Sequence, residues 1–192
     1  MAVESTMLEL GTQAPDFALP DTVTGETVRL ADFAESKALV VVFVANHCPY
    51  VKHIQQGLVA LGRDYENTGT AIVAIGSNDV VAYPEDAPEE LGRVAQELGY
   101  TFPVLFDESQ DTAGAYAAAC TPDFFLFGPD MALVYRGRLD SSRPGSEVPV
   151  TGEDLRAAID ALLAGEPVAE VQYPSTGCSI KWKPGNVPVA FG

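Results

Sequence analysis

Basic residues are scarce in this chain of 192 residues, where 11 Lys and Arg stand against 27 Asp and Glu and the formal net charge is −16. A surface of that sign repels phosphate groups, which argues against nucleic acid and anionic membranes as partners. Long apolar runs are also missing, because the longest, residues 39–45, falls far below the roughly 18–20 residues that cross a bilayer. The first thirty residues contain no basic stretch followed by an apolar segment, so no secretory signal is predicted. We therefore expect a cytoplasmic protein.

Cysteine is rare as well, with three residues at Cys48, Cys120 and Cys178. An odd number in a chain of this size does not fit a small disulfide-stapled scaffold, and thiols in a reducing compartment are better candidates for chemistry. The length and the 47% hydrophobic content fit a single globular domain. We expect this domain to cover residues 1–165. Residues 166–192, rich in Pro and Gly and without periodicity, should form an extended C-terminal tail that packs on it.

Hydrophobic patterning predicts an α/β fold. Residues 38–45 form a continuous β-branched run, typical of a central strand buried on both faces, and apolar residues spaced by three and four predict a helix over 49–65. An N-terminal hairpin is expected from short strands at 14–20 and 27–30. The pattern continues with strands at 70–76, 103–107, 124–127 and 133–139 and helices at 88–99, 109–119 and 151–163. This order predicts a mixed sheet with helices on both faces and an antiparallel last strand pair.

Side chains at the helix starts carry further predictions. Asp86 and Thr151 are expected to cap the helices at 88–99 and 151–163. His53 lies off the apolar stripe of the first long helix, so we expect it to be solvated.

The segment Asn46-His47-Cys48-Pro49-Tyr50-Val51 lies where the buried strand turns into the first long helix. Pro49 suits the first helical position, because its missing N–H would be unpaired there anyway. Cys48 then falls at the helix N-cap, where free backbone amides and the positive end of the helix dipole favour a thiolate over a thiol. We predict that Cys48 is the nucleophile. The neighbouring His47 either tunes the thiol or covers a loop, and Asn46 belongs to the same candidate site.

A second segment, Cys120-Thr121-Pro122-Asp123, opens an apolar strand. Proline is tolerated in such a place only at the first residue of the strand or at a special turn, and a cis peptide bond is one way to meet this requirement.

Taken together, the two segments resemble the thioredoxin superfamily, in which a reactive cysteine heads the first helix and a Thr–cis-Pro loop faces it. The wider sequence, from residue 11 to about 185, resembles the AhpC/TSA branch and, within it, peroxiredoxin-like proteins with an Asn-His-Cys-Pro-Tyr-Val segment. This resemblance implies a thioredoxin fold with Cys48, Thr121 and Pro122 in the active site, without a cofactor or metal. The matching segments are residues 11–19, 101–107, 120–127, 135–140 and 177–186.

The chain departs from the family patterns at several positions. Thioredoxins carry a second cysteine three residues after the first, where this chain has Val51, so a local dithiol is impossible. Typical peroxiredoxins carry a Thr and a Pro where Ala45 and Val41 stand, and their active-site Arg has no clear counterpart. Arg136 and Arg138 could replace it electrostatically, although the edge of the sheet is their expected place.

These observations leave three hypotheses. In the first, the protein is a thiol-dependent peroxidase or reductase, in which Cys48 is oxidised by a peroxide or attacks a disulfide. A second thiol then resolves it, either Cys178 delivered by a flexible tail, Cys120, or a small external thiol. A small thiol or a thioredoxin-type protein would be the reductant, and the resemblance also implies a possible homodimer.

The second hypothesis is a redox-inactive binding or sensing module that displays Cys48 and the Thr121-Pro122 loop to a protein partner. The third is a copper or zinc site built from His47, Cys48, His53 and Cys178.

Overall fold

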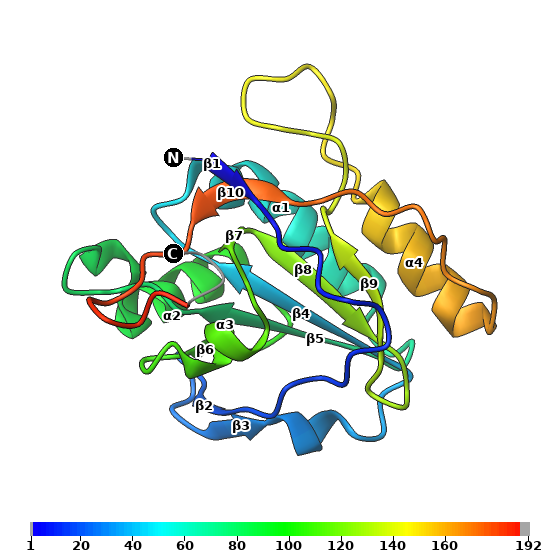
Figure 1. Ribbon diagram of the computed structural model, residues 1–192, viewed down its shortest axis with the longest axis horizontal. Coiled ribbons are helices and arrows are strands. Elements are labelled where there is room, and N and C mark those ends of the chain that lie inside the picture. The colour runs from blue at the N-terminus through cyan, green and yellow to red at the C-terminus, as the bar shows by residue number, and fades with distance from the viewer. Residues whose placement is uncertain (1, 189–192) are drawn as a thin grey trace.

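A computed structural model describes residues 2–188, and its core is a five-stranded mixed sheet (Figure 1). The strands run in the order β6-β5-β4-β8-β9, with β4 in the centre as predicted. β5 is parallel to β4 and to β6, whereas β8 is antiparallel to both β4 and β9. The strands are β4 (Ala38–Val44), β5 (Thr70–Gly76), β6 (Val104–Phe106), β8 (Asp123–Phe127) and β9 (Leu133–Gly137).

The central strand is buried on both faces, and its side chains alternate between two hydrophobic clusters. Val40 and Val42 belong to the cluster formed with α1 (Pro49–Asp64), α2 (Pro88–Leu98) and α4 (Glu153–Ala164). Leu39, Val41 and Phe43 belong to the opposite cluster. This second face is covered by α3 (Asp111–Ala115) and by the predicted hairpin of β2 (Ala18–Pro20) and β3 (Thr27–Arg29). The arrangement confirms the predicted thioredoxin fold.

A second, smaller sheet was not predicted. It joins β1 (Ala2–Glu4), β10 (Thr176–Ser179) and β7 (Cys120–Thr121) in the order β1-β10-β7, with both pairings antiparallel. In Figure 1 these strands lie together near the N-terminus of the chain. Residues 176–179 of the expected C-terminal tail thus form a strand that the sequence did not predict. Four residues of mixed polarity give no periodic signal, and the strand exists only because distant segments pair with it.

Three local predictions are also corrected. The N-cap of α2 is Ala87 and not Asp86, and the N-cap of α4 is Gly152 and not Thr151. The predicted helix over 109–119 is reduced to the five residues of α3. Two short 3₁₀ helices complete the fold, η1 (Leu30–Phe33) and η2 (Pro84–Asp86). Within residues 2–188, no helix has both the length and the apolar character needed to span a membrane.

Candidate functional site

Cys48 is the N-cap residue of α1, and Pro49 opens the helix, as the sequence predicts. The thiol does not cap the helix, however, because Cys48 makes no side-chain hydrogen bond to the first amides of α1. Its Sγ instead donates to the backbone oxygen of Thr121 at 3.1 Å. Cys48 is 0% exposed in this structure. A thiol open to solvent at the head of the helix is therefore not what the structure contains.

The Thr121–Pro122 peptide bond is cis, as the family resemblance implies. The bond lies between β7 and β8, and the carbonyl that receives the Cys48 thiol belongs to Thr121. The structure thus brings the two predicted segments into direct contact. The side-chain oxygen of Thr121 is buried and has no hydrogen-bond partner among the described residues.

Cys178 reaches the same place from the C-terminal end of the chain. It lies in β10 directly opposite Thr121, and its side chain packs against the cluster that contains Cys48. Burial raises the pKa of the Cys178 thiol to about 11, and a hydrogen bond with Cys48 adds to the rise while Lys181 opposes it. The prediction that a flexible tail delivers Cys178 is wrong, because strand pairing holds the residue in place.

The third cysteine, Cys120, lies on the other face of the small sheet, opposite Ser179. It is buried, and its Sγ lies 3.6 Å from the backbone oxygen of Pro122. Burial raises the pKa of this thiol, and the nearby Asp123 raises it further. Cys120 is therefore a neutral thiol behind the cis-proline loop.

Asn46 and His47 point away from the sulfurs. The Asn46 side chain donates to the backbone oxygen of Glu85 at 3.1 Å. The buried carboxylate of Asp86 accepts from the backbone N–H of His47 at 3.1 Å and lies 2.5 Å from Nδ1 of its ring. The Asn78 side chain also donates to Asp86, at 2.8 Å. Asp86 is thus missing from the cap of α2 because it anchors the loop that precedes Cys48.

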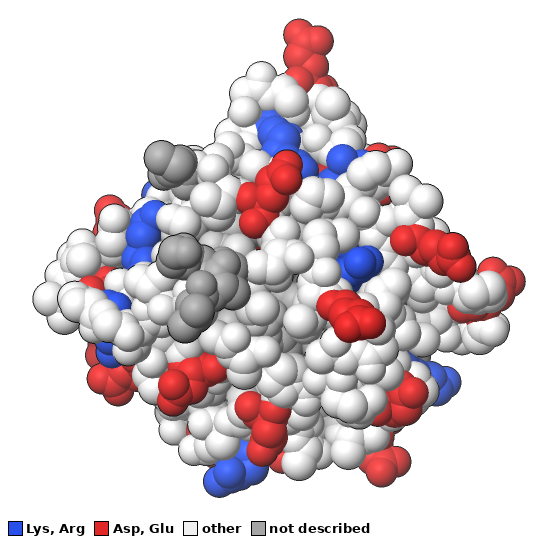
Figure 2. Space-filling model, in the orientation of Figure 1, with Lys and Arg blue, Asp and Glu red and all other residues white. Residues whose placement is uncertain are grey.

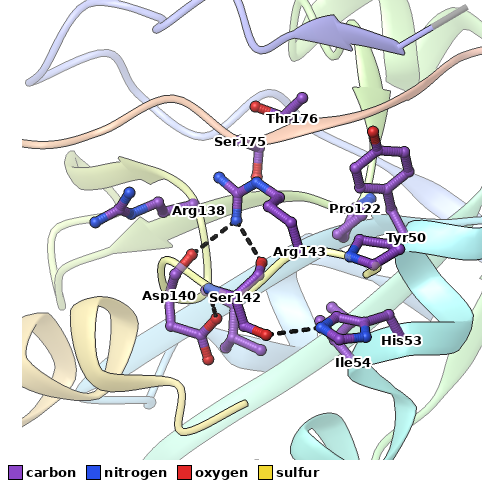
Figure 3. Close-up of a pocket in the computed structure, with 12 residues that line it drawn as sticks. Tyr50, His53, Ile54, Pro122, Arg138, Asp140, Ser142, Arg143, Ser175 and Thr176 are labelled. Carbon is purple, nitrogen blue, oxygen red and sulfur yellow. Dashed lines mark hydrogen bonds between the residues drawn. The ribbon is translucent and has the colours of Figure 1, made fainter. Parts of the chain in front are cut away.

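A pocket opens beside the cis-proline, on the side of Tyr50 and of the loop that follows β9 (Figure 3). Its walls include His53, which bonds to Ser142 Oγ at 2.7 Å, so the expectation of a solvated His53 is wrong. Arg143 also lines the pocket. A positive charge near the cis-proline therefore comes from Arg143, in the loop after β9. The sequence did not predict this placement because no regular element positions Arg143.

The two arginines considered from the sequence are engaged in other contacts, although Arg138 also lines this pocket. Arg136 donates to the backbone oxygen of Leu8 and to the side chain of Gln172. Arg138 pairs with Asp154 at 2.6 Å and lies over the ring of Tyr173.

A metal site does not form from the residues considered. In the part of the chain that the structure describes, no group of three or more His, Cys, Asp or Glu side chains is arranged to hold a metal ion. Acidic side chains are instead spread across the visible face of the molecule (Figure 2).

Asp123 is a further buried group that sequence reasoning overlooked. It is 0% exposed, and one of its carboxyl oxygens has no partner among the described residues. Its other oxygen accepts from the N–H of Ala119 at 3.4 Å. A signal for it was present, because the carboxyl directly precedes the apolar run of a buried strand, where a charge is costly.

Comparison with known proteins places the chain in a family. Residues 10–136 match the model of the AhpC/TSA family. A Mycobacterium tuberculosis protein named as a candidate peroxiredoxin is 30% identical over 60% of this chain and 68% of its own length. The thiol-disulfide oxidoreductase ResA of Geobacillus thermodenitrificans is 28% identical over 83% of this chain and 81% of its own. The crystal structure of an uncharacterized conserved protein from Geobacillus kaustophilus is 58% identical, with a TM-score of 0.95 over 96% of this chain and 98% of that one.

Proposed function

Because the chain belongs to the AhpC/TSA family, we propose that it is a thiol-disulfide oxidoreductase that alternates between two thiols, Cys48 and Cys178, and a disulfide between them. The observation that carries the proposal is that Cys178, in β10, packs against the cluster that contains Cys48 and interacts with the Cys48 side chain, beside the cis-proline. A relative named as a thiol-disulfide oxidoreductase supports the same chemistry. Val51 occupies the position at which thioredoxins carry their second cysteine. In this chain Cys178, in the distant strand β10, acts as the second thiol instead.

The reaction with a disulfide substrate needs no further reactant. The Cys48 thiolate attacks one sulfur of the substrate and forms a mixed disulfide, and one substrate thiol leaves. The Cys178 thiol then attacks the Cys48 sulfur, the second substrate thiol leaves, and the two cysteines become a disulfide. A small thiol or a thioredoxin-type protein would reduce this disulfide again.

Cys48 is the first nucleophile in this scheme because it stands at the N-terminus of α1, in contact with the cis-proline loop. The raised pKa of Cys178 keeps that thiol protonated near pH 7. Since Cys48 is covered by the small sheet, Cys178 must move aside to admit a substrate. Strand pairing holds the backbone of β10, so this movement is a rotation of the partly exposed Cys178 side chain.

Mass spectrometry tests the proposal, with the remaining free thiols blocked only after the oxidation step. After one equivalent of a disulfide oxidant, the parent should lose two hydrogens and yield a peptide pair that joins Cys48 to Cys178. Cys178→Ser should stop at a mixed disulfide on Cys48, Cys48→Ser should not react, and Cys120→Ser should still form the link. A link through Cys120, or a mixed disulfide trapped on Cys178 in the Cys48→Ser variant, would overturn the scheme.

Peroxide reduction is the second candidate, supported by the relative named as a candidate peroxiredoxin. In that reaction a peroxide oxidises Cys48 to a sulfenic acid, and Cys178 condenses with it, releasing water. The same mass measurement after one equivalent of hydrogen peroxide separates the two activities. A disulfide link formed at least as fast with peroxide as with a disulfide oxidant would favour the antioxidant role.

A further inference from the structure

The pocket beside the cis-proline has a positive group without a negative partner. Arg143 lies in this pocket, and its Nη1 donates to the backbone oxygens of Asp140 at 2.9 Å and of Ser142 at 2.7 Å (Figure 3). These two bonds fix the guanidinium on the loop after β9. The structure records no acceptor for its Nε and Nη2 groups among the described residues, and no ion pair of Arg143.

The nearby carboxylate does not neutralise Arg143. Asp140 is buried, and its two side-chain oxygens accept from three backbone N–H groups, those of Ser142 at 2.9 Å, Thr151 at 2.8 Å and Gly152 at 2.6 Å. The Asp140 side chain therefore interacts with the backbone amides at the start of α4. A half-buried arginine without a carboxylate is unexpected in a chain with 27 acidic residues. Open N–H groups on a fixed guanidinium are suited to bind an anion from outside.

The rest of the pocket is held in place by hydrogen bonds. Ser142 donates its hydroxyl hydrogen to the backbone oxygen of Val148 at 2.7 Å. The Ser142 hydroxyl oxygen must therefore accept the hydrogen bond from Nε2 of His53. Figure 3 shows the rings of His53 and Tyr50, both from α1, on the wall that faces the arginine loop. The pocket is therefore preorganised around Arg143.

Two segments of the chain connect the wall of the pocket to the two thiols. Pro122, on its wall, follows the residue whose carbonyl receives the Cys48 thiol. Thr176, also on its wall, is in β10 two residues before Cys178. A substrate whose sulfur reaches the thiol pair can place a neighbouring group in the pocket.

We propose that Arg143 binds a carboxylate carried by the disulfide substrate, so that the protein selects substrates with a carboxylate close to the reacting sulfur. This inference rests on the proposed thiol-disulfide exchange and names its substrate class. Binding orients the substrate disulfide for attack by Cys48, and the electron balance of the exchange is unchanged.

Two disulfides that release coloured thiols test the proposal. Dithiobis-nitrobenzoate carries a carboxylate on each half, and dithiodipyridine carries none. Loss of the charge-assisted bonds in Arg143→Gln should slow the reaction of the reduced protein with the first compound about tenfold. The rate with the second should stay within about twofold of the parent. Arg63→Gln, which removes an exposed arginine from the far end of α1, is the matched control and should leave both rates unchanged.

Equal slowing with both compounds would assign Arg143 a structural role, and unchanged rates with both would remove it from substrate binding. A binding measurement without sulfur keeps the two proposals apart. Nitrobenzoate, but not nitrobenzamide, should shift the Arg143 side-chain resonances in an NMR titration even in Cys48→Ser. If Cys48→Ser reacts with both disulfides at the parent rate, the proposed function fails. If nitrobenzoate shifts nothing, the carboxylate site fails.

Discussion

Two buried carboxyl groups near the thiols differ in how the fold treats them. Asp86 accepts hydrogen bonds from the backbone N–H of His47 and from the Asn78 side chain, and it also lies against Nδ1 of the His47 ring. Asp123 has one long bond to a backbone amide and one oxygen without a partner in the described part of the chain. Burial raises the pKa of Asp123 well above its usual range. The fold therefore satisfies the Asp86 carboxyl group with hydrogen bonds and leaves that of Asp123 poorly satisfied.

The raised pKa of Asp123 predicts a specific dependence of stability on pH. Above the unfolded pKa of about 4, the folded protein binds more protons than the unfolded chain, so this group costs stability as the pH rises toward its folded pKa. Asp123→Asn removes that cost. The free energy of unfolding of Asp123→Asn minus that of the parent should increase by up to about 1.4 kcal/mol per pH unit in this window. Urea unfolding at several pH values measures the difference, with Asp111→Asn, an exposed residue, as the control.

A difference between parent and Asp123→Asn that stays constant from acidic to neutral pH would show that folding does not raise the pKa of Asp123.

At the scale of the element, β10 decides the geometry of the site. It inserts between β1 and β7, covers Cys48 and sets Cys178 opposite Thr121. The close approach depends on Gly177, where an added Cβ would lie 1.9 Å from the backbone oxygen of Thr121. The same carbonyl oxygen of Thr121 accepts the hydrogen bond from the Cys48 thiol. The pairing and the thiol contact are thus parts of one arrangement.

Gly177→Ala should push β10 away from β7, because a methyl group cannot share space with a backbone oxygen. We expect a loss of about 1–3 kcal/mol in the free energy of unfolding, as for other overpacked sites. The Cys48–Cys178 link should also form more slowly. Gly114→Ala in α3 is the control, because nothing lies within 4 Å of its added Cβ. An unchanged unfolding midpoint and link rate in Gly177→Ala would mean that β10 is not clamped at this point.

At the scale of the whole molecule, charge is the dominant feature. The net charge of −16 is distributed over the surface, and like charges oppose the compact state. The five recorded ion pairs in the described residues engage only a minority of the 27 acidic residues. The remaining repulsion is long-ranged and is therefore sensitive to salt.

Salt should stabilise the folded protein. Raising the ionic strength from about 0.01 to 0.15 M shortens the screening length from roughly 30 to 8 Å. The free energy of unfolding should rise by about 1 kcal/mol through weaker self-repulsion. Urea unfolding measures this change without adding ions, and sodium and potassium chloride should act alike. A midpoint that is unchanged or lower at the higher salt concentration would contradict the prediction.

The sequence by itself determined the elements whose signals are local. The apolar run of β4, the amphipathic face of α1 and the place of Cys48 at its N-cap all follow from neighbouring residues. A strand or a helix must bury its own apolar side chains, so its pattern is written along a short stretch of chain.

Only the tertiary structure decided what surrounds the thiol. Cys48 bonds to a residue 73 positions away, and His47 meets Asp86 across 39 positions. Cys178 joins the site through a four-residue strand without a pattern of its own. Arg143 enters the pocket from an irregular loop. Such contacts depend on how whole elements pair and pack, and this arrangement leaves no periodic signal in any one segment.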